Sequence, residues 1–148
     1  MVEGPGYVSN PEMWDAIVPQ MRSGVIWRPI LAVDFDGTCA ITHVTKDIAD
    51  LDARPVYAVA ESLRGYCVYF DVFVVSARAS CRAGADAILR ALMEFGLREE
   101  ELAKICVTNC KPPAHVSIDD RCWCFRGKWP QVEKLLAFAP WHGRGIVE

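Results

Sequence analysis

The alternation of short apolar runs with amphipathic segments from residue 30 onward is the feature of this sequence that most constrains its fold. The run at residues 30–35 is almost wholly apolar and is closed by acids and a glycine, which is typical of a strand buried on both faces. Buried strands that alternate with helices of about a dozen residues are the pattern of a parallel sheet with crossover helices. We therefore expect an α/β fold in which helices cover both faces of a central parallel sheet.

The expected elements follow the order strand, helix, strand, helix, strand, strand, helix. Gly65 and Gly96 are expected to end the first two helices, and Pro130 is expected to open the last one. The expected ranges are strand 30–35, helix 55–64, strand 68–75, helix 82–95 with a further turn at 98–103, strands 105–108 and 116–118, and helix 130–136.

The chain is expected to divide into an N-terminal appendage, residues 1–27, and one main domain, residues 28–148. The capping signal at Ser9-Asn10-Pro11-Glu12 predicts a short helix that runs to about Met21. Its apolar residues recur at helical spacing, so packing on the main domain is the expected role and a dimer contact is the alternative. Both a monomer and a homodimer are compatible with this pattern.

Composition narrows the classes of partner. The net charge of −3 provides no general attraction to a polyanion, so a nucleic-acid partner would require a local basic patch. No stretch approaches the roughly 18 apolar residues of a membrane span, and we expect a cytoplasmic protein without a membrane partner. The seven cysteines are expected to be reduced thiols. A zinc-stabilised interaction domain is the alternative, although the cysteine spacing matches no paired zinc motif.

Polar side chains follow four of the expected strands at the point where each strand ends. Asp34 and Asp36 close the first, Ser76 follows the second, Lys111 follows the third, and Asp119-Asp120 follows the fourth. The carboxyl ends of parallel strands meet at one edge of a sheet, where ligands usually bind. Carboxylates can hold a hard cation, and a serine and a lysine can bind a phosphate, which together are the groups that phosphoryl transfer requires.

These motifs, in this order, resemble those of the haloacid dehalogenase-like (HAD) hydrolase superfamily, over roughly residues 30–130. The resemblance rests on Asp34-Phe35-Asp36-Gly37-Thr38, Ser76, Lys111 and Asp119-Asp120. It implies a Rossmann-like HAD fold and a magnesium-dependent phosphatase. In that superfamily the residue matching Asp34 becomes an aspartyl phosphate, and the residue matching Asp36 protonates the leaving oxygen and later activates water. Aspartate at position 36 favours a phosphatase, because the transporting ATPases of the superfamily carry threonine there and its dehalogenases lack this second acid.

The resemblance also implies three sets of site residues. The expected catalytic residues are Asp34, Asp36 and Lys111. The expected phosphate-binding residues are Gly37, Thr38, Ser76, Ala77 and Lys111. The expected Mg²⁺ ligands are Asp34, Asp36 through its backbone carbonyl, Asp119 and Asp120. Two alternatives stay open: Lys104 could replace Lys111, and Asp120 could pair with Arg121 and orient Asp119 instead of binding the metal directly.

Several other residues are expected to be structural. Arg78 is expected to pair with a surface acid, and contact with a substrate phosphate is the alternative. The aromatic residues near the C-terminus are expected to pack that segment, and stacking on a base is the alternative role. These aromatic residues are Trp123, Phe125, Trp129 and Trp141.

The spacing of the motifs leaves no room for a full cap domain. Only about forty residues separate Asp36 from Ser76, which one helix, one strand and normal connections nearly use up. At most, residues 39–53 form a small flap with Thr42, His43 and Thr45 at its polar tips. Such an open site suits a phosphorylated small molecule or a nucleic-acid end.

Short stretches add a resemblance that concerns the substrate. Residues 117–121 resemble a motif in the phosphatase domain of phage polynucleotide kinase-phosphatase, and residues 111–130 resemble small capless phosphatases of phage and bacteria. They imply a phosphomonoesterase that acts on a nucleotide or a nucleic-acid 3′ phosphate. The alternative is a catalytically silent module of the same fold that binds a phosphorylated partner.

Overall fold

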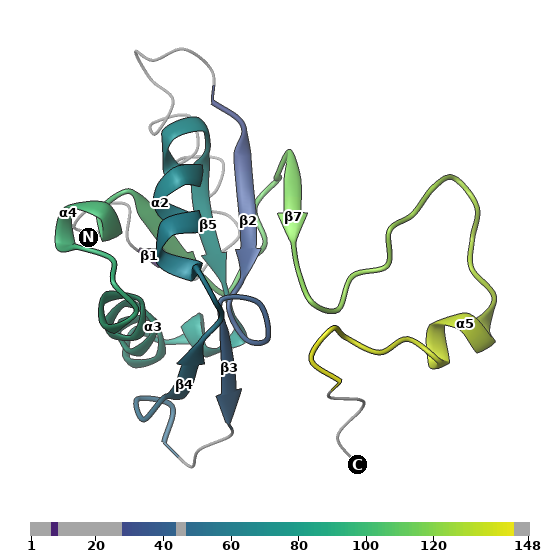
Figure 1. Ribbon diagram of the computed structural model, residues 1–148, viewed down its shortest axis with the longest axis horizontal. Coiled ribbons are helices and arrows are strands. Elements are labelled where there is room, and N and C mark those ends of the chain that lie inside the picture. Colours follow the sequence, from purple (N-terminus) through teal and green to yellow (C-terminus); the bar gives the residue numbers. More distant parts are fainter. Residues whose placement is uncertain (1–6, 9–27, 44–46, 144–148) are drawn as a thin grey trace.

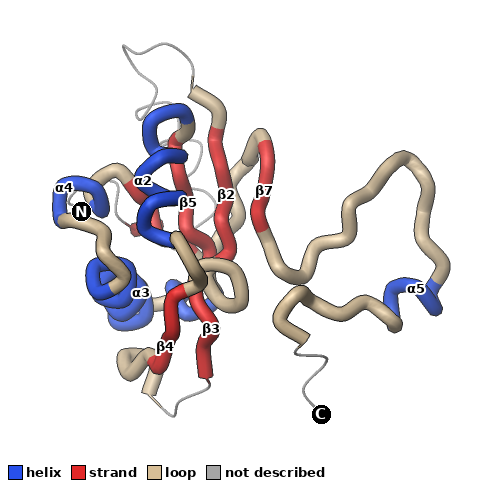
Figure 2. The backbone as a smooth tube through the Cα atoms, viewed as in Figure 1, coloured by secondary structure: helices blue, strands red, loops and turns tan. Residues whose placement is uncertain are grey.

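A parallel sheet with helices packed against it makes up most of the structure, a computed structural model that describes residues 7–8, 28–43 and 47–143 (Figures 1 and 2). The strands are β1 (Tyr7–Val8), β2 (Ile30–Asp34), β3 (Ala40–His43), β4 (Asp52–Pro55), β5 (Asp71–Val75), β6 (Ile105–Thr108) and β7 (Val116–Ile118). The helices are α2 (Val59–Tyr69), the 3-10 helix η2 (Ala77–Ser80), α3 (Arg82–Glu94), α4 (Glu99–Leu102) and α5 (Val132–Leu136).

The main sheet has the strand order β1-β6-β5-β2-β7, and all of its pairs are parallel. This arrangement confirms the expected α/β class with a parallel sheet. The chain moves from β2 to β5 to β6 in one direction, so right-handed crossovers place the intervening helices on the same face. β1 adds two residues from the predicted appendage to the edge of the sheet, whereas the predicted helix ending near Met21 lies outside the described residues.

Alternate strand residues form a buried core beneath the helices. The core residues from the three central strands share one face, since successive side chains point to opposite faces. These residues are Leu31, Val33, Val72, Val74, Ile105 and Val107. They pack with Leu63 of α2, with Ile88 and Leu92 of α3, and with Leu102 of α4. Helices were expected on both faces, and α2, α3 and α4 pack on this one; on the opposite face Ala32, Phe73 and Cys106 are also buried.

Helix α2 differs from its predicted range at both ends. Pro55, the expected start, closes β4, and Gly65, the expected stop, lies inside the helix. The helix continues to Tyr69 because Tyr66 and Cys67, one turn beyond Leu63, pack against the core. A glycine preference for helix ends is a weak local signal that such packing overrides. The strand expected from residue 68 therefore begins only at Asp71.

The other expected elements lie close to their predicted positions. Helix α3 ends at Glu94, followed by Gly96 with φ +118°, and β6 and β7 have the predicted bounds. The predicted flap is an antiparallel hairpin of β3 and β4, and its expected tip at Thr45 lies outside the described residues. In the described part of the chain, the connections from β2 to β6 contain this hairpin and helices, with no cap domain.

Residues 121–141, here called the arm, leave the sheet after β7 and extend away from the body before returning to it (Figure 1). The arm contains α5, in which no residue is buried. The expected packing of the C-terminal aromatic residues within their own segment is found for Phe125 and Trp129, whose ring centroids lie 4.8 Å apart. The four aromatic side chains nevertheless remain exposed to solvent. These side chains belong to Trp123, Phe125, Trp129 and Trp141. None of the described helices is long and apolar enough to span a bilayer.

Replacement of Gly65 by alanine tests the corrected course of α2. Gly65 is exposed in the helix interior, and an added Cβ would meet no atom within 4 Å. We expect Gly65→Ala to raise the free energy of unfolding by about 0.5–1 kcal/mol, measured by urea denaturation. A helix that ended at a left-handed Gly65 would instead be destabilised. Gly84→Ala is the contrasting variant, because its Cβ would lie 1.8 Å from the carbonyl oxygen of Arg78.

Candidate metal and phosphate site

Three carboxylates meet at the carboxyl edge of the sheet. Asp34 ends β2, and Asp119 and Asp120 directly follow β7. The parallel register pairs Val33 with Ile118, so the two strands release their acids side by side. Carboxylate oxygens of all three lie within 4.8 Å of one another. Three of the four expected metal ligands therefore converge, and this group of oxygen ligands could hold a hard cation.

Burial and the neighbouring acids together change the ionisation of Asp34. Its pKa is raised from the ordinary 3.8 to about 8, first by burial, then by a hydrogen bond with Asp120 and by the charges of Asp119, Asp120 and Asp36. The pKa of Asp120 is lowered: burial opposes this, but hydrogen bonds with His142 and Asp34 outweigh it. The environment of the pair therefore favours the protonated form of Asp34 and the ionised form of Asp120.

Asp36 has a different environment only two residues away. Ser76 Oγ donates to its Oδ2 at 2.6 Å, and Thr42 Oγ1 donates to its Oδ1 at 2.8 Å. Arg78 Nε also lies 2.8 Å from Oδ1. Burial tends to raise the pKa of Asp36, but the hydrogen bonds from Ser76, Arg78 and Thr42 and the charge of Arg78 outweigh it and lower the pKa. Asp36 is therefore held ionised.

The expectation that Arg78 pairs with a surface acid is wrong. Its partner is Asp36, and the Arg78 side chain is only 18% exposed. The helix η2 explains this position, because its first turn begins at Ser76, whose Oγ accepts from the Arg78 N–H at 3.2 Å. Ser76 and Arg78 are thus positioned together beside Asp36, at the end of β5.

The expected phosphate-binding residues surround the acids, and several of their donors are already engaged. Thr38 Oγ1 lies 3.4 Å from Asp34 Oδ2, and the Gly37 N–H donates to the Ala40 carbonyl at 2.7 Å. Ser76 donates to Asp36. Ala77 is exposed at the start of η2. A phosphate would therefore have to take over the hydroxyl donor of Ser76 from Asp36.

The two candidate lysines, Lys111 and Lys104, lie in different parts of the structure. Lys111 lines a hollow of about 30 Å³ together with Asp34 and Asp119. Lys104 precedes β6 at the amino edge of the sheet and lines a different pocket with Cys67. Of the two, only Lys111 lies beside the acidic cluster.

Two residues that the sequence did not indicate complete the site. His142 Nε2 lies 2.8 Å from Asp120 Oδ2, and the two side chains are 8% and 3% exposed. Trp141 Nε1 donates to the Gly37 carbonyl oxygen at 2.8 Å. Asp120 Oδ2 also lies 3.8 Å from Arg121 Nε, so the alternative pairing of Asp120 with Arg121 exists alongside the acidic cluster. His142 and Trp141 lie in a tail without periodicity, which carries no local signal for these contacts.

At Gly37 the loop after β2 approaches Asp120 and His142 closely. The φ of Gly37 is +86°, and a Cβ there would lie 2.3 Å from Asp120 Oδ2 and 2.9 Å from His142 Nε2. Gly127 is a matched control, because its φ is +83° and its Cβ would meet nothing within 4 Å. We expect about 1–2 kcal/mol of backbone strain in Gly127→Ala and a larger loss of stability in Gly37→Ala, measured by denaturation. Equal losses in the two variants would contradict the close packing at Gly37.

The protonated state of Asp34 predicts an unusual dependence of stability on pH. Because its folded pKa is raised, the native state binds this proton more tightly than the unfolded state, and the stabilisation fades as pH rises towards about 8. Without divalent cations, we expect the melting temperature to fall by a few degrees between about pH 5 and pH 8. Asp34→Asn should remove most of this fall, and added Mg²⁺ should oppose it in the wild type. An unchanged pH profile in the variant would contradict the assignment.

Comparison of the chain with protein-family models, with curated proteins and with solved structures gives no match.

Proposed function

We propose that this protein is a Mg²⁺-dependent phosphomonoesterase with a Rossmann-like HAD fold. The observation that carries the proposal is the convergence of Asp34, Asp119 and Asp120 within 4.8 Å at the carboxyl edge of a parallel sheet, with Lys111 in the same hollow. The three acids can hold a metal ion, and the positive charge of Lys111 can bind a phosphate. Phosphoryl transfer requires both groups.

The acidic cluster suits a divalent cation because it brings three carboxylates together. Burial, the hydrogen bond with Asp120 and the neighbouring acids raise the pKa of Asp34 to about 8, and a bound cation would favour its ionised form. Mg²⁺ typically binds through one or two carboxylates together with water and substrate phosphate. A small open cluster therefore suits Mg²⁺ better than a closed cage of protein ligands. When bound, the ion would neutralise charge on the phosphoryl oxygens. Asp34, Asp119 and Asp120 would hold it, with the backbone carbonyl of Asp36.

Asp34 is the nucleophile in the proposed reaction. One of its carboxylate oxygens forms a bond to phosphorus while the bond from phosphorus to the ester oxygen breaks, and the alcohol leaves with a proton from Asp36. Water then attacks the aspartyl phosphate, gives its proton to Asp36, and releases inorganic phosphate and free Asp34. Lys111 binds the phosphate and favours the ionised form of Asp34.

The contacts of Asp36 suit its role as a base and require a change before it acts as an acid. Arg78 and Ser76 stabilise its ionised form, and a carboxyl group with a lowered pKa is a poor proton donor. An entering phosphate competes for the same arginine and hydroxyl. Loss of these two donors would raise the pKa of Asp36 towards the range of a general acid.

A nucleotide or a nucleic-acid 3′ phosphate is the proposed substrate class. In the described structure the site is bordered by the β3–β4 hairpin and by Trp141 and His142, with no cap domain over it, which leaves room for a phosphate attached to a larger molecule. The short-motif resemblance to capless phosphatases points in the same direction.

Hydrolysis of a generic aryl phosphate by the full-length protein tests the proposal. We expect Mg²⁺-dependent phosphate release that Asp34→Asn abolishes, because the amide cannot form the aspartyl phosphate. Asp86→Asn is the matched control, since Asp86 pairs with Arg82 on the exposed side of α3, and its activity should be unchanged. Lys111→Ala should lower kcat/KM at least tenfold, and Lys104→Ala should leave it near the wild-type value.

Full activity in Asp34→Asn would overturn the proposed mechanism. Retained phosphate-ester binding without turnover, across nucleotides, sugar phosphates and 3′-phosphorylated oligonucleotides, would instead identify a silent module that binds a phosphorylated partner.

A further inference from the structure

The arm exposes aromatic rings that a folded chain normally buries. Trp129 is 84% exposed and Trp141 is 64% exposed, and α5 between them buries no residue. Phe125 and Trp129 pack on one another, with ring centroids 4.8 Å apart, and their outer faces stay open. An exposed apolar surface of this size marks an interaction site in a soluble protein.

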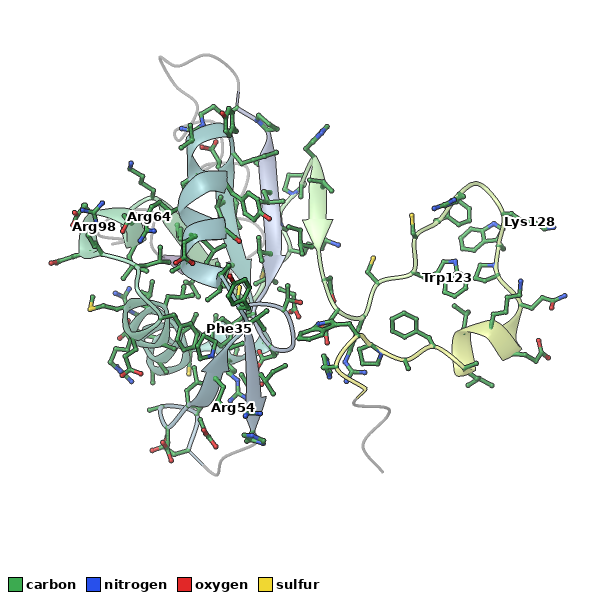
Figure 3. The ribbon with its side chains drawn as sticks, viewed as in Figure 1. Phe35, Arg54, Arg64, Arg98, Trp123 and Lys128 are labelled. Atoms are coloured by element: carbon green, nitrogen blue, oxygen red, sulfur yellow. The ribbon has the colours of Figure 1, made fainter. Side chains whose placement is uncertain are left out.

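The charge of the arm differs in sign from that of the rest of the chain. Residues 121–141 contain four basic residues and one acid, a net charge of +3, whereas all other residues together carry −6. Arg126, Lys128 and Lys134 are exposed and make no ion pair within the described part of the chain. Figure 3 shows Lys128 at the outer end of the arm, away from the sheet. The arm is thus the local basic patch that a polyanion would need.

Both ends of the arm lie at the acidic cluster. Arg121 follows Asp120, and Trp141 donates its indole N–H to the carbonyl of Gly37, beside the proposed nucleophile. This hydrogen bond fixes one edge of the indole and leaves its ring accessible. A ligand that binds along the arm can therefore extend directly to the proposed phosphate site.

We infer that the arm is a binding surface for single-stranded nucleic acid, and that it leads the end of the strand to the site, the latter part resting on the proposed phosphatase function. Alternating aromatic rings and cations are the chemistry that binds single strands, because bases stack on the rings while phosphates pair with the cations. A duplex offers no open base faces to such rings. A second copy of the chain fits less well, since two arms of charge +3 would repel one another.

Binding of an unphosphorylated, fluorescently labelled oligonucleotide of about ten nucleotides tests the surface independently of catalysis. We expect the wild-type protein to bind it with an affinity that falls as salt concentration rises. Replacement of Arg126, Lys128 and Lys134 by alanine should reduce the slope of log K against log salt by about 2. Trp129→Ala should weaken binding about tenfold, whereas Tyr69→Ala, which removes an exposed ring from the end of α2, should have no effect.

Activity measurements on two substrates test the connection to the site. Trp129→Ala should lower kcat/KM about tenfold for a 3′-phosphorylated oligonucleotide and leave it unchanged for an aryl phosphate. A wild-type protein that binds the oligonucleotide but hydrolyses neither substrate would overturn the proposed phosphatase function and support the binding surface. Intact phosphatase activity without salt-dependent oligonucleotide binding would overturn the inference. Dimers in light scattering that Trp129→Ala dissociates would also overturn it, because they would assign the arm to a second copy.

Discussion

The pairing of β2 with a parallel strand on each side is the interaction on which both the sheet and the site depend. Five residues of β2 pair with β5, which places Asp34 opposite Val75, directly before Ser76. On its other side β2 pairs with β7, so that Ile118 lies opposite Val33 and Asp119 follows. A shift of one residue in either register would turn the acid or the serine to the other face of the sheet. The buried core beneath α2 and α3 holds these registers fixed, because a shift would also expose its apolar side chains.

The electrostatic contrast between Asp34 and Asp36 follows from the same geometry. Asp36 receives Ser76 and Arg78 from the turn after β5, so the fold itself provides its counter-charge. Asp34 is partly buried on the side where β7 delivers two further acids, and burial, the hydrogen bond with Asp120 and these charges raise its pKa. The fold thus gives Asp36 a counter-charge and places Asp34 in an acidic cluster. A pKa perturbed by burial together with neighbouring charges is typical of functional sites, which supports the proposed metal site.

The parts of the structure that the sequence predicted are those set by local pattern and by the rule that parallel strands end at one edge. Asp34, Asp119 and Asp120 could be grouped for that reason, although 85 residues separate the first two. The true end of α2 could not be predicted, because it depends on the packing of Tyr66 and Cys67 against the core rather than on Gly65. Composition likewise cannot distinguish an apolar side chain in the core from one left exposed, so the exposure of the aromatic residues of the arm could not be predicted. The contact of His142 with Asp120 depends on the path of the whole arm, which no local signal contains.

That contact makes the arm a closed loop whose ends meet at the acidic cluster. His142 lies 22 residues after Asp120 along the chain, and closing a loop of this length costs conformational entropy that the arm cannot recover from a core of its own. The contacts of His142 with Asp120 and of Trp141 with Gly37 offset this cost at one point. Asp120 Oδ2 is therefore shared between closing the loop and completing the cluster. On the proposed function, a ligand that orders the arm and a cation at the cluster would act on the same carboxylate, and their binding free energies would be linked in both directions.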